Sequence, residues 1–344
     1  MEMVSTPRRS SQYSVGVSTR VLAGFEDPSF GPEHWEKLLA DSNTDIVYLT
    51  WHWQRTWWEL HPRSQLLLIV AERDGQAVAL APFYAESGMI FFVGTGFESG
   101  YLDFIGDIGN PDVLDALLET ARANVSDFSG FRFYFVPDSS STGKHLAAAA
   151  ERLGFKCYDE GETAGPVLDL ASEAALAAVN KKRRTTDYER ILRRDGSLEI
   201  EHMRDGRVIQ PHLDEFFTQH MSRWAAKGHP SVFANQKQRT FIEQLTLVAA
   251  NTGWLRFTRA TWNGRPIAFH YGFCYRGRYF YEVPSFEIGL ARYSPGLVLL
   301  RNLLLAAMAE GAHTFDFGIG DQEYKYKFVT HVNRARTFGL YPSG

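Results

Sequence analysis

The sequence contains the same order of structural signals twice, and this repetition constrains the fold more than any other feature. In the first copy, strand-like apolar runs surround or follow the tight-turn pair Asp74-Gly75, at residues 66–71, 77–83 and 89–93. In the second copy, the turn pairs Asn263-Gly264 and Arg276-Gly277 separate strand-like runs at residues 254–262, 266–275 and 279–283. Such runs joined by two-residue turns predict antiparallel meanders. Two copies in one chain predict an internal duplication.

Each predicted meander is followed by a helical stretch and one more apolar strand. These are residues 113–123 and 131–136 in the first copy, and residues 297–309 and 314–319 in the second. A helix between two strands must pack on the sheet, and the right-handed crossover rule then places the last strand parallel to a neighbour. Helical stretches also precede the meanders, at residues 33–40, 54–60 and 213–226. We therefore expect an α/β fold of two tandem units, each a mixed, mostly antiparallel sheet flanked by helices.

Length and composition agree with two globular domains. The chain has 344 residues, of which 44% are hydrophobic and 22% are charged. These values are ordinary for globular domains of ~150 residues each. Residues 1–18 have no apolar period, so we expect a mobile N-terminal tail there. The first unit is predicted to span residues 19–165, and the second is predicted to span residues 166–344.

Charge and hydropathy limit the expected partners. The formal net charge of -4 argues against a protein that binds DNA, because the bulk attraction to phosphate would be missing. The most apolar run, residues 297–309, contains Arg301 and Asn302, so no segment is predicted to span a membrane. A long apolar region of the secretory type is missing near the N-terminus, which makes a cytoplasmic location the default expectation. With two cysteines and no HExxH run, we expect no metal site.

Five motifs follow one another between about Leu176 and Phe328: KKRRTTDYERILRRDG, HMSRWAAKG, NGRPIAFHYGF, YSPGLVLL and FDFGIGDQEYKYKF. In this order they resemble the GNAT acyltransferase superfamily and, more narrowly, its CelD/BcsL-like branch, which is named for an association with cellulose biosynthesis. The resemblance implies two GNAT-like halves, as in the Fem-type aminoacyl transferases of peptidoglycan synthesis, with the first half degenerate. It also implies transfer of an acyl group, expected to be acetyl, from acyl-CoA to an amine in a ternary complex. Acyl-CoA would be a co-substrate, with no tightly bound cofactor, and an envelope or exopolysaccharide precursor would be the acceptor.

The run ARYSPG leads into the predicted helix at residues 297–309. Ser294 is expected at the N-cap, Pro295 at the first helical position, and Gly296 where a ligand could approach the backbone. Unpaired amides at a helix N-terminus attract anions. In GNAT enzymes the equivalent turn holds the pyrophosphate of CoA, and the resemblance implies this role for Arg292, Ser294, Gly296 and Leu297. The second glycine of the family's pattern is missing, and a well-capped core helix without a ligand is the alternative.

Two neighbouring strands of the second meander carry titratable groups. On residues 265–275, alternation places His270 on a face of small residues, either as a site residue or as a hydrogen-bonded core histidine. On the next strand, Glu282 shortly precedes Pro284, which would interrupt regular pairing. Substrates of GNAT enzymes meet at this strand end, so the resemblance makes Glu282 the expected general base. A carboxylate at the rim, paired with an arginine, is the alternative.

Polar residues follow the strand predicted at residues 314–319, where open α/β sheets tend to bind ligands. Gly320, Asp321, Tyr324 and Lys325 match a Gly-Asp-x-x-Tyr-Lys pattern of the CelD/BcsL-like branch. By this resemblance, Tyr324 would protonate the leaving thiolate, Lys325 would bind a phosphate or an acceptor carboxylate, and Asp321 would bind substrate. The alternative is an amphipathic segment whose Tyr and Lys side chains pack on the sheet.

Two further candidates lie elsewhere. In the basic run, Arg183, Arg190 and Arg194 would share one helix face and could meet CoA phosphates, a sugar nucleotide or tRNA, or form a solvated charged face. In the first unit, Ser99 and Asp103 match part of a Ser-Asp-Tyr-x-Asp pattern of the same branch, which makes Asp103 a candidate acceptor-binding residue.

The sequence as a whole predicts an acyltransferase of the GNAT type, active in the second unit. Two alternatives stay open. The basic run indicates a Fem-like transferase that uses aminoacyl-tRNA as the donor. The missing second glycine near Gly296 indicates a catalytically inactive protein that keeps the fold and binds a metabolite or a partner.

Overall fold

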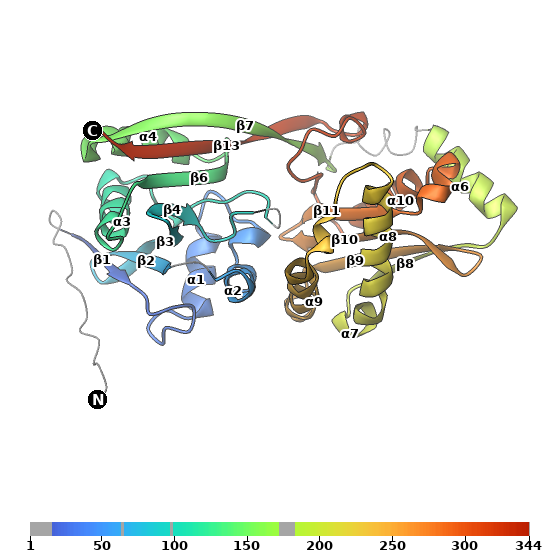
Figure 1. Ribbon diagram of the computed structural model, residues 1–344, viewed down its shortest axis with the longest axis horizontal. Helices are drawn as coiled ribbons and strands as arrows, with labels where there is room; N and C mark the ends of the chain where they lie inside the picture. Colours follow the sequence, from blue (N-terminus) through green and yellow to red (C-terminus); the bar gives the residue numbers. More distant parts are fainter. Residues whose placement is uncertain (1–15, 63–64, 97–98, 172–182, 344) are drawn as a thin grey trace. The chain divides into compact units, whose positions relative to one another are not determined.

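The computed structural model describes residues 16–62, 65–96, 99–171 and 183–343 (Figure 1). The chain divides into two compact units. Unit 1 consists of the residues up to Glu162 together with Arg334–Gly344, and unit 2 consists of Thr163–Asn333. The break after Glu162 lies close to the boundary predicted at residue 165. The segment that begins at Arg334 belongs to unit 1 and not, as predicted, to the second unit, because it pairs with a strand of unit 1.

Unit 1 contains a mixed sheet with the strand order β1-β2-β3-β4-β6-β13-β7, and the short β5 pairs with β3. The strands are β1 (Val17–Val21), β2 (Gln65–Arg73), β3 (Gln76–Glu86), β4 (Met89–Phe92), β5 (Ile105–Gly106), β6 (Gly130–Pro137), β7 (Phe155–Asp169) and β13 (His331–Pro342). The helices are α1 (Pro32–Ala40), η1 (Val47–Leu49), α2 (Trp51–Leu60), α3 (Pro111–Ala123) and α4 (Thr142–Leu153). β4 and β6 are parallel, as the predicted crossover through α3 requires.

Unit 2 repeats this plan with the strand order β7-β12-β11-β10-β9-β8. Its strands are β8 (Leu198–Met203), β9 (Leu255–Trp262), β10 (Arg265–Tyr275), β11 (Arg278–Phe286) and β12 (Thr314–Asp316). Its helices are α6 (Arg183–Asp195), α7 (Gly206–Ile209), η2 (Gln210–His212), α8 (Leu213–Ala225), η3 (Val232–Ala234), α9 (Gln236–Asn251), η4 (Ile288–Tyr293), α10 (Pro295–Ala309) and η5 (Lys325–Lys327). β11 and β12 are parallel and are connected by α10. The prediction of two tandem mixed α/β units is confirmed.

The three predicted tight turns are present. Asp74, Asn263 and Arg276 have positive φ angles of 52°, 51° and 47°, and the glycine that follows each of them is also positive in φ. Two successive positive φ angles are typical of the type I′ hairpin turn, which matches the twist of the flanking strands. The meanders therefore form where the sequence places these turns.

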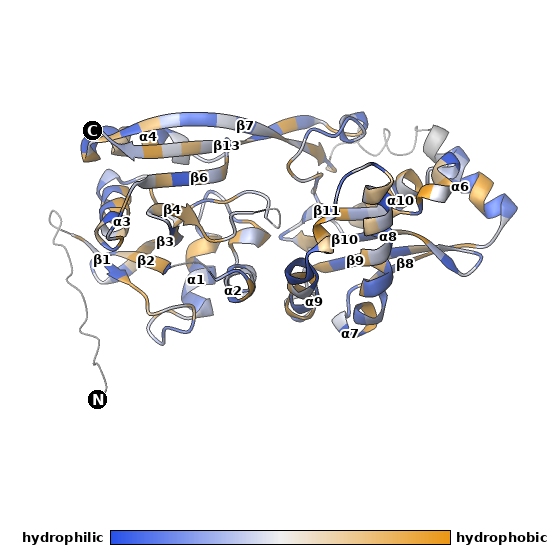
Figure 2. Ribbon diagram, in the orientation of Figure 1, coloured by the Kyte–Doolittle hydropathy of each residue, from blue (hydrophilic) through white to orange (hydrophobic). Residues whose placement is uncertain are grey.

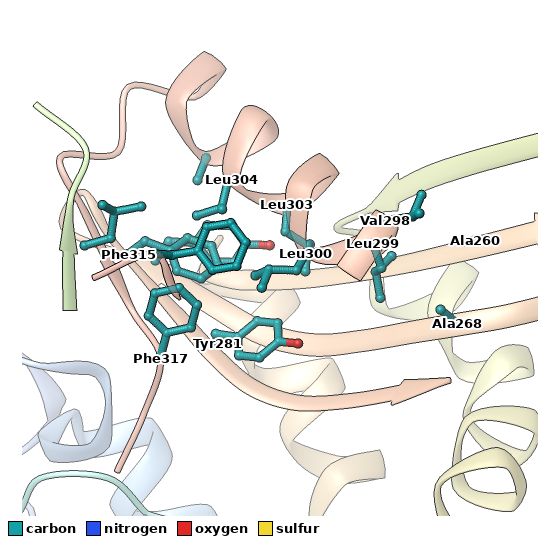
Figure 3. Close-up of a cluster of buried hydrophobic side chains, with 14 of the residues drawn as sticks. Ala260, Ala268, Tyr281, Val298, Leu299, Leu300, Leu303, Leu304, Phe315 and Phe317 are labelled. Atoms are coloured by element: carbon teal, nitrogen blue, oxygen red, sulfur yellow. The ribbon is translucent and has the colours of Figure 1, made fainter. Parts of the chain in front are cut away.

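Helix α10 supplies much of the apolar core on one face of the unit 2 sheet (Figure 3). Its leucines pack with residues from four strands and from the chain after β12: Ala260, Ala268, Tyr281, Phe315 and Phe317. Helices α8 and α9 cover the other face, where Phe216 of α8 contacts Phe257 and Phe269. Alternation along β10 therefore places Phe269 and Ala268 on opposite faces, as predicted.

Two strands differ from simple expectation. β7 has a hydrophilic, exposed middle stretch (Figure 2), whereas its residues 165–168 are buried and its residues 167–169 pair with β12. β12 ends at Asp316, before the predicted end at residue 319, because Gly318 turns the chain at φ 71° and its N–H bonds to the Asp316 carboxylate at 2.8 Å. Within the described ranges, no helix combines the length and the apolar character that a membrane crossing needs.

Candidate functional site

Strands β11 and β12 stay paired over only three residues each and then separate. The paired stretches are residues 278–280 of β11 and 314–316 of β12. β11 continues to Phe286, whereas β12 ends at Asp316. The polar residues that follow β12 therefore meet the second half of β11 without an intervening strand ladder.

A bulge in β11 lies at the same level. Tyr281 and Glu282 both lie opposite Gly272, because the register is Tyr271 to Val283 on one side and Phe273 to Phe280 on the other. A Cβ on Gly272 would clash with the carbonyl oxygen of Phe280, which explains the glycine. A bulge re-aims the side chains next to it. We use the name strand-divergence site for the residues that gather here: Arg223, Tyr281, Glu282, Tyr324 and Lys325.

Two tyrosines of the strand-divergence site are joined by a hydrogen bond. The hydroxyls of Tyr281 and Tyr324 are hydrogen-bonded to each other. Burial raises the pKa of both phenols above the ordinary value, and the nearby Arg223 guanidinium acts in the opposite direction. Both phenols are therefore neutral at neutral pH. A neutral Tyr324 carries a proton that it can donate to a leaving group.

Arg223 reaches this site from α8. Its Nη1 donates to the Pro284 carbonyl at 2.8 Å, and its Cζ lies 4.2 Å from the centroid of the Phe286 ring. Its Nε is buried and has no partner among the described residues. Burial lowers the pKa of Arg223, but a guanidinium keeps its charge in proteins. An unpaired, charged donor thus lies in the site. The sequence motif HMSRWAAKG contained Arg223, but nothing in it revealed that the side chain reaches β11.

Lys325 is buried, and its ammonium group is occupied. Its Nζ donates to the carbonyl oxygens of residues 318–320 at 3.2–3.4 Å. Burial lowers the pKa of Lys325 to about 8, while the carboxylates of Asp316, Glu282 and Asp321 act in the opposite direction. An ammonium has three protons, and each has a carbonyl acceptor here. Lys325 therefore holds the chain that follows β12, and a phosphate would have to compete with these carbonyls.

The three carboxylates near Lys325 have different surroundings. Asp316 is fully buried and receives a hydrogen bond from Arg278 Nη2 at 2.5 Å. Asp321 is exposed and accepts a hydrogen bond from the Tyr326 hydroxyl. Glu282 is half-buried in the bulge of β11. Among these three, Glu282 is the carboxylate that is both partly accessible and next to Tyr281 in the chain.

His270 of β10 is completely buried beside Tyr281 of the strand-divergence site. Its ring stacks on Tyr281, with 4.9 Å between centroids and 10° between planes. Neither ring nitrogen has a partner among the described residues. Burial lowers the pKa of His270 to about 3. A group with this pKa is poorly matched to proton abstraction at neutral pH, so the geometry favours a structural role for His270.

The N-terminus of α10 has the predicted sequence positions but an unexpected backbone. Ser294 is the N-cap and Pro295 the first helical residue, yet Ser294 has a φ of 48° and its side chain makes no capping hydrogen bond. A Cβ on Gly296 would lie 2.8 Å from Phe286 Cδ1, so close packing already explains this glycine. Arg292 is exposed and lies over the Tyr293 ring, and Leu297 packs at the edge of the core. The first turn of α10 has no acidic residue.

The corresponding helix of unit 1 has a different N-terminus. The Asn110 side chain accepts a hydrogen bond from the Asp112 N–H, and Asp112 places a carboxylate in the first turn of α3. The helix dipole favours anions at this end, but a carboxylate already present repels another anion. Of the two equivalent helices, α10 is therefore better suited to an anionic ligand.

The basic run forms α6, whose first residue is Arg183; the side chain of Arg183 lies outside the described part of the structure. The side chain of Arg184 also lies outside the described part, and the three arginines whose side chains are described have acidic partners in the same helix: Arg190 with Asp187, Arg193 with Glu189, and Arg194 with Asp195. Glu189 also joins Arg301 of α10. These pairs match the expectation of a solvated charged face.

Asp103 is buried in unit 1, and its carboxylate is fully engaged. It accepts hydrogen bonds from Thr44 Oγ1 at 2.7 Å, from Thr142 Oγ1 at 2.6 Å and from the Phe104 N–H at 2.9 Å. Burial raises the pKa of Asp103, and these bonds oppose the rise. The structure thus shows Asp103 joining separate segments of unit 1 and leaves it little capacity to contact an acceptor.

Asp103→Ala should lower the free energy of unfolding by about 3–5 kcal/mol, because it leaves two buried hydroxyls and one N–H without an acceptor. Asp103→Asn should cost less, since it keeps the shape and the threonine hydroxyl that faces the new NH2 group can turn to accept a hydrogen bond from it. Urea unfolding of the two variants measures this difference. A stable Asp103→Ala protein that has lost acceptor binding would instead support the substrate role.

Among the described residues, no group of three or more His, Cys, Asp or Glu side chains is arranged to hold a metal ion. Residues 180–326 match the protein family described as an acetyltransferase (GNAT) domain. No curated protein matches the chain at a significant level. This match supports the GNAT superfamily for residues 180–326, and the CelD/BcsL-like branch is not confirmed.

Solved structures of similar fold cover most of the chain at low sequence identity. The crystal structure of FemX has a TM-score of 0.65 and 12% identity, over 90% of this chain and 96% of that one. A tandem GNAT protein from the clavulanic acid biosynthesis pathway has a TM-score of 0.54 and 12% identity, over 95% and 100% of the two chains. The C-terminal domain of a putative lysylphosphatidylglycerol synthetase from Agrobacterium fabrum has a TM-score of 0.54 and 14% identity, over 90% and 91%. The chain therefore has a tandem GNAT architecture, and its residues 180–326 carry the match to the GNAT acetyltransferase domain.

Proposed function

We propose that unit 2 is an N-acyltransferase that moves an acyl group, taken to be acetyl, from acyl-CoA to an amine in a ternary complex. One observation carries this proposal. The strand-divergence site contains a partly accessible carboxylate (Glu282), a neutral phenol (Tyr324) and a guanidinium whose Nε has no partner among the described residues (Arg223). Arg223 also packs on the Phe286 ring, which lies against Gly296 in the first turn of α10. The match of residues 180–326 to the GNAT acetyltransferase domain supports it.

These groups can perform the complete reaction. Glu282 accepts a proton from the acceptor's ammonium group, and the neutral amine attacks the thioester carbonyl carbon. Arg223 Nε stabilises the negative charge that develops on the carbonyl oxygen. The C–S bond then breaks, and Tyr324 donates its proton to the CoA thiolate. The Tyr324 phenolate regains a proton from the new amide nitrogen, and Glu282 releases its proton to solvent. Lys325 acts as a positioning residue, because it holds residues 318–320 next to this centre.

Donor binding at α10 can be tested at Ser294, a position whose left-handed backbone tolerates both Asp and Asn. Ser294→Asp adds a carboxylate at the helix N-terminus and should weaken acetyl-CoA binding about tenfold or more, since like charges repel by on the order of 1–4 kcal/mol at this range. Ser294→Asn has the same shape without the charge and should bind within a few-fold of wild type. Calorimetric titration with acetyl-CoA measures both. Equal affinity of the two variants would place the donor elsewhere.

The acceptor is proposed from the sequence resemblance to the CelD/BcsL-like branch, which favours an amine on an envelope or exopolysaccharide precursor. Asp321 is the exposed carboxylate in the turn after β12, and we propose that it contacts such an acceptor. A screen of amines with acetyl-CoA, followed as release of the free CoA thiol, would identify it.

Specific features of the chain favour two other functions. The basic helix α6 favours an aminoacyl-tRNA donor, although its described arginines are paired with acids. Tight tRNA binding that weakens steeply with salt would support that donor. The missing second glycine near Gly296 favours an inactive binding protein. Amine-dependent release of CoA from acetyl-CoA would exclude inactivity.

A further inference from the structure

Unit 2 contains an open pocket of about 370 Å³ between α8 and the ends of β10 and β11. Its lining is formed by Asp214, Glu215, Thr218, Gln219 and Ser222 of α8, by Pro266 and Phe269 of β10, and by Glu287 after β11. This volume lies in the range of small-molecule sites, which is ~300–1,000 Å³. We call it the acidic pocket.

The charged residues of the lining are all acidic. They are Asp214, Glu215 and Glu287, and their side chains are exposed. Pro266 and Phe269 add apolar surface to the same wall. Two of the carboxylates lie in the first turn of α8, where acids also stabilise the helix. The negative charge alone therefore does not define a binding site. A ligand that is complementary to both the carboxylates and the apolar wall combines positive charge with methylene carbons.

Gln219 supplies independent evidence for a ligand. It is 9% exposed, and its Nε2 donates to the Pro266 carbonyl at 3.4 Å. Its Oε1 is buried and has no partner among the described residues, although the side chain lines the pocket. An unpaired buried carbonyl oxygen costs about 1–3 kcal/mol, which a ligand N–H would remove. Because Oε1 is an acceptor, the missing partner is a donor, and this agrees with the carboxylates.

The acidic pocket lies next to the strand-divergence site along β11. Phe269 of the pocket pairs with Ser285, which is three residues after Glu282. At ~3.3 Å per residue, these two positions on β11 are roughly 10 Å apart. On α8, the pocket residue Ser222 is followed directly by Arg223, which reaches the strand-divergence site. A single extended ligand could therefore contact both.

We infer that the acidic pocket binds one ammonium group of an acceptor that carries at least two amines, while a second amine reaches Glu282. The inference rests on the proposed N-acyl transfer and names its substrate class, a small diamine or polyamine. The spacing along β11 calls for amines roughly 10 Å apart, which a chain of several methylenes provides. The methylenes would lie on Phe269 and Pro266.

Calorimetric titration of the full chain with diaminooctane, and with octylamine as the matched monoamine, tests the inference. We expect the diamine to bind about tenfold more tightly or better, and the difference to shrink as salt increases. The double variant Glu215→Gln/Glu287→Gln should lose most of this preference. Glu199→Gln, at an exposed position of β8, removes a charge outside the pocket and should bind as wild type does.

Gln219→Leu separates binding from folding. Leucine removes the unpaired Oε1 and only a long hydrogen bond to Pro266, so the Tm should stay the same or rise while the diamine binds several-fold more weakly. A lower Tm with unchanged diamine affinity would show that Gln219 serves the fold alone and would overturn the inference.

The remaining outcomes distinguish the inference from the proposed function. In one outcome acetyl-CoA binds, octylamine is acylated as fast as diaminooctane, and the pocket variants behave as wild type. The acidic pocket then does not select the acceptor, and the proposed function stands. If the diamine binds through the pocket but acetyl-CoA is neither bound nor consumed, the proposed function fails and the pocket is a diamine site of another kind.

Discussion

Glu282→Gln should lower kcat for acyl transfer by about 100-fold to 10,000-fold, the range that general acid–base catalysis contributes. The substitution removes the proton acceptor but keeps the shape of the side chain in the bulge of β11. The affinity for acetyl-CoA and the Tm should stay close to those of the wild type, because Glu282 is not part of the α10 N-terminus or the core. Release of CoA thiol in the presence of the screened amine measures kcat, and calorimetry measures the affinity.

The pH dependence distinguishes a base from a structural carboxylate. If Glu282 accepts the proton, raising the pH should partly restore the Glu282→Gln rate, because more of the acceptor amine is then already neutral. Glu199→Gln is the matched control and should retain full activity at every pH. A wild-type kcat in Glu282→Gln would show that another group, or solvent, acts as the base.

Acid should destabilise the protein strongly through two buried histidines. Burial lowers the pKa of His270 to about 3 and that of His220 to about 4, against an ordinary value of 6.5. Below pH 6.5 the unfolded chain binds protons that the folded chain does not, so the free energy of unfolding falls as the pH falls. Between pH 7.5 and pH 5 the loss should be about 2 kcal/mol for each histidine, or about 4 kcal/mol together.

His270→Phe provides the control for this effect. Phenylalanine can stack on Tyr281 as the imidazole does, and it removes two buried nitrogens that have no partner among the described residues. The variant should therefore be at least as stable as the wild type at pH 7.5 and should lose about 2 kcal/mol less at pH 5. His220 is less suitable for replacement, because it accepts a hydrogen bond from Trp224 and bonds to Ser231. Urea unfolding at the two pH values measures the slopes, and an unchanged slope in His270→Phe would contradict the assignment.

Strand β12 ends earlier than its apolar pattern predicts. The apolar pattern predicted a strand to residue 319, but a hydrogen bond from Gly318 to Asp316 ends it at Asp316. Because of this early end, β11 is not paired with β12 beyond Phe280. The pattern of apolar residues does not contain this information, because the bond depends on the backbone conformation at Gly318.

The local elements and the duplication follow from the sequence alone. Turn pairs such as Asn263-Gly264 adopt positive φ angles at low cost, strands alternate with a period of two, and proline begins a helix at Pro295. These signals depend on residues that are close together in the chain, so they can be recognised in the sequence. They predicted Glu282 near the end of a strand, but this strand continues to Phe286, and Glu282 lies at a bulge within it.

Tertiary structure alone decided which of the candidate residues meet and what each can do. Arg223 reaches β11 from a helix far away in the sequence, Lys325 bonds to three carbonyls, and Gly296 is required by the Phe286 ring. Asp103 joins separate segments of unit 1, and the segment from Arg334 returns to that unit. Burial and hydrogen-bond partners arise from contacts between distant parts of the chain, and these contacts set the charge and the availability of each group. For this reason the sequence determined the fold and the candidate residues, whereas only the packed structure determined their roles.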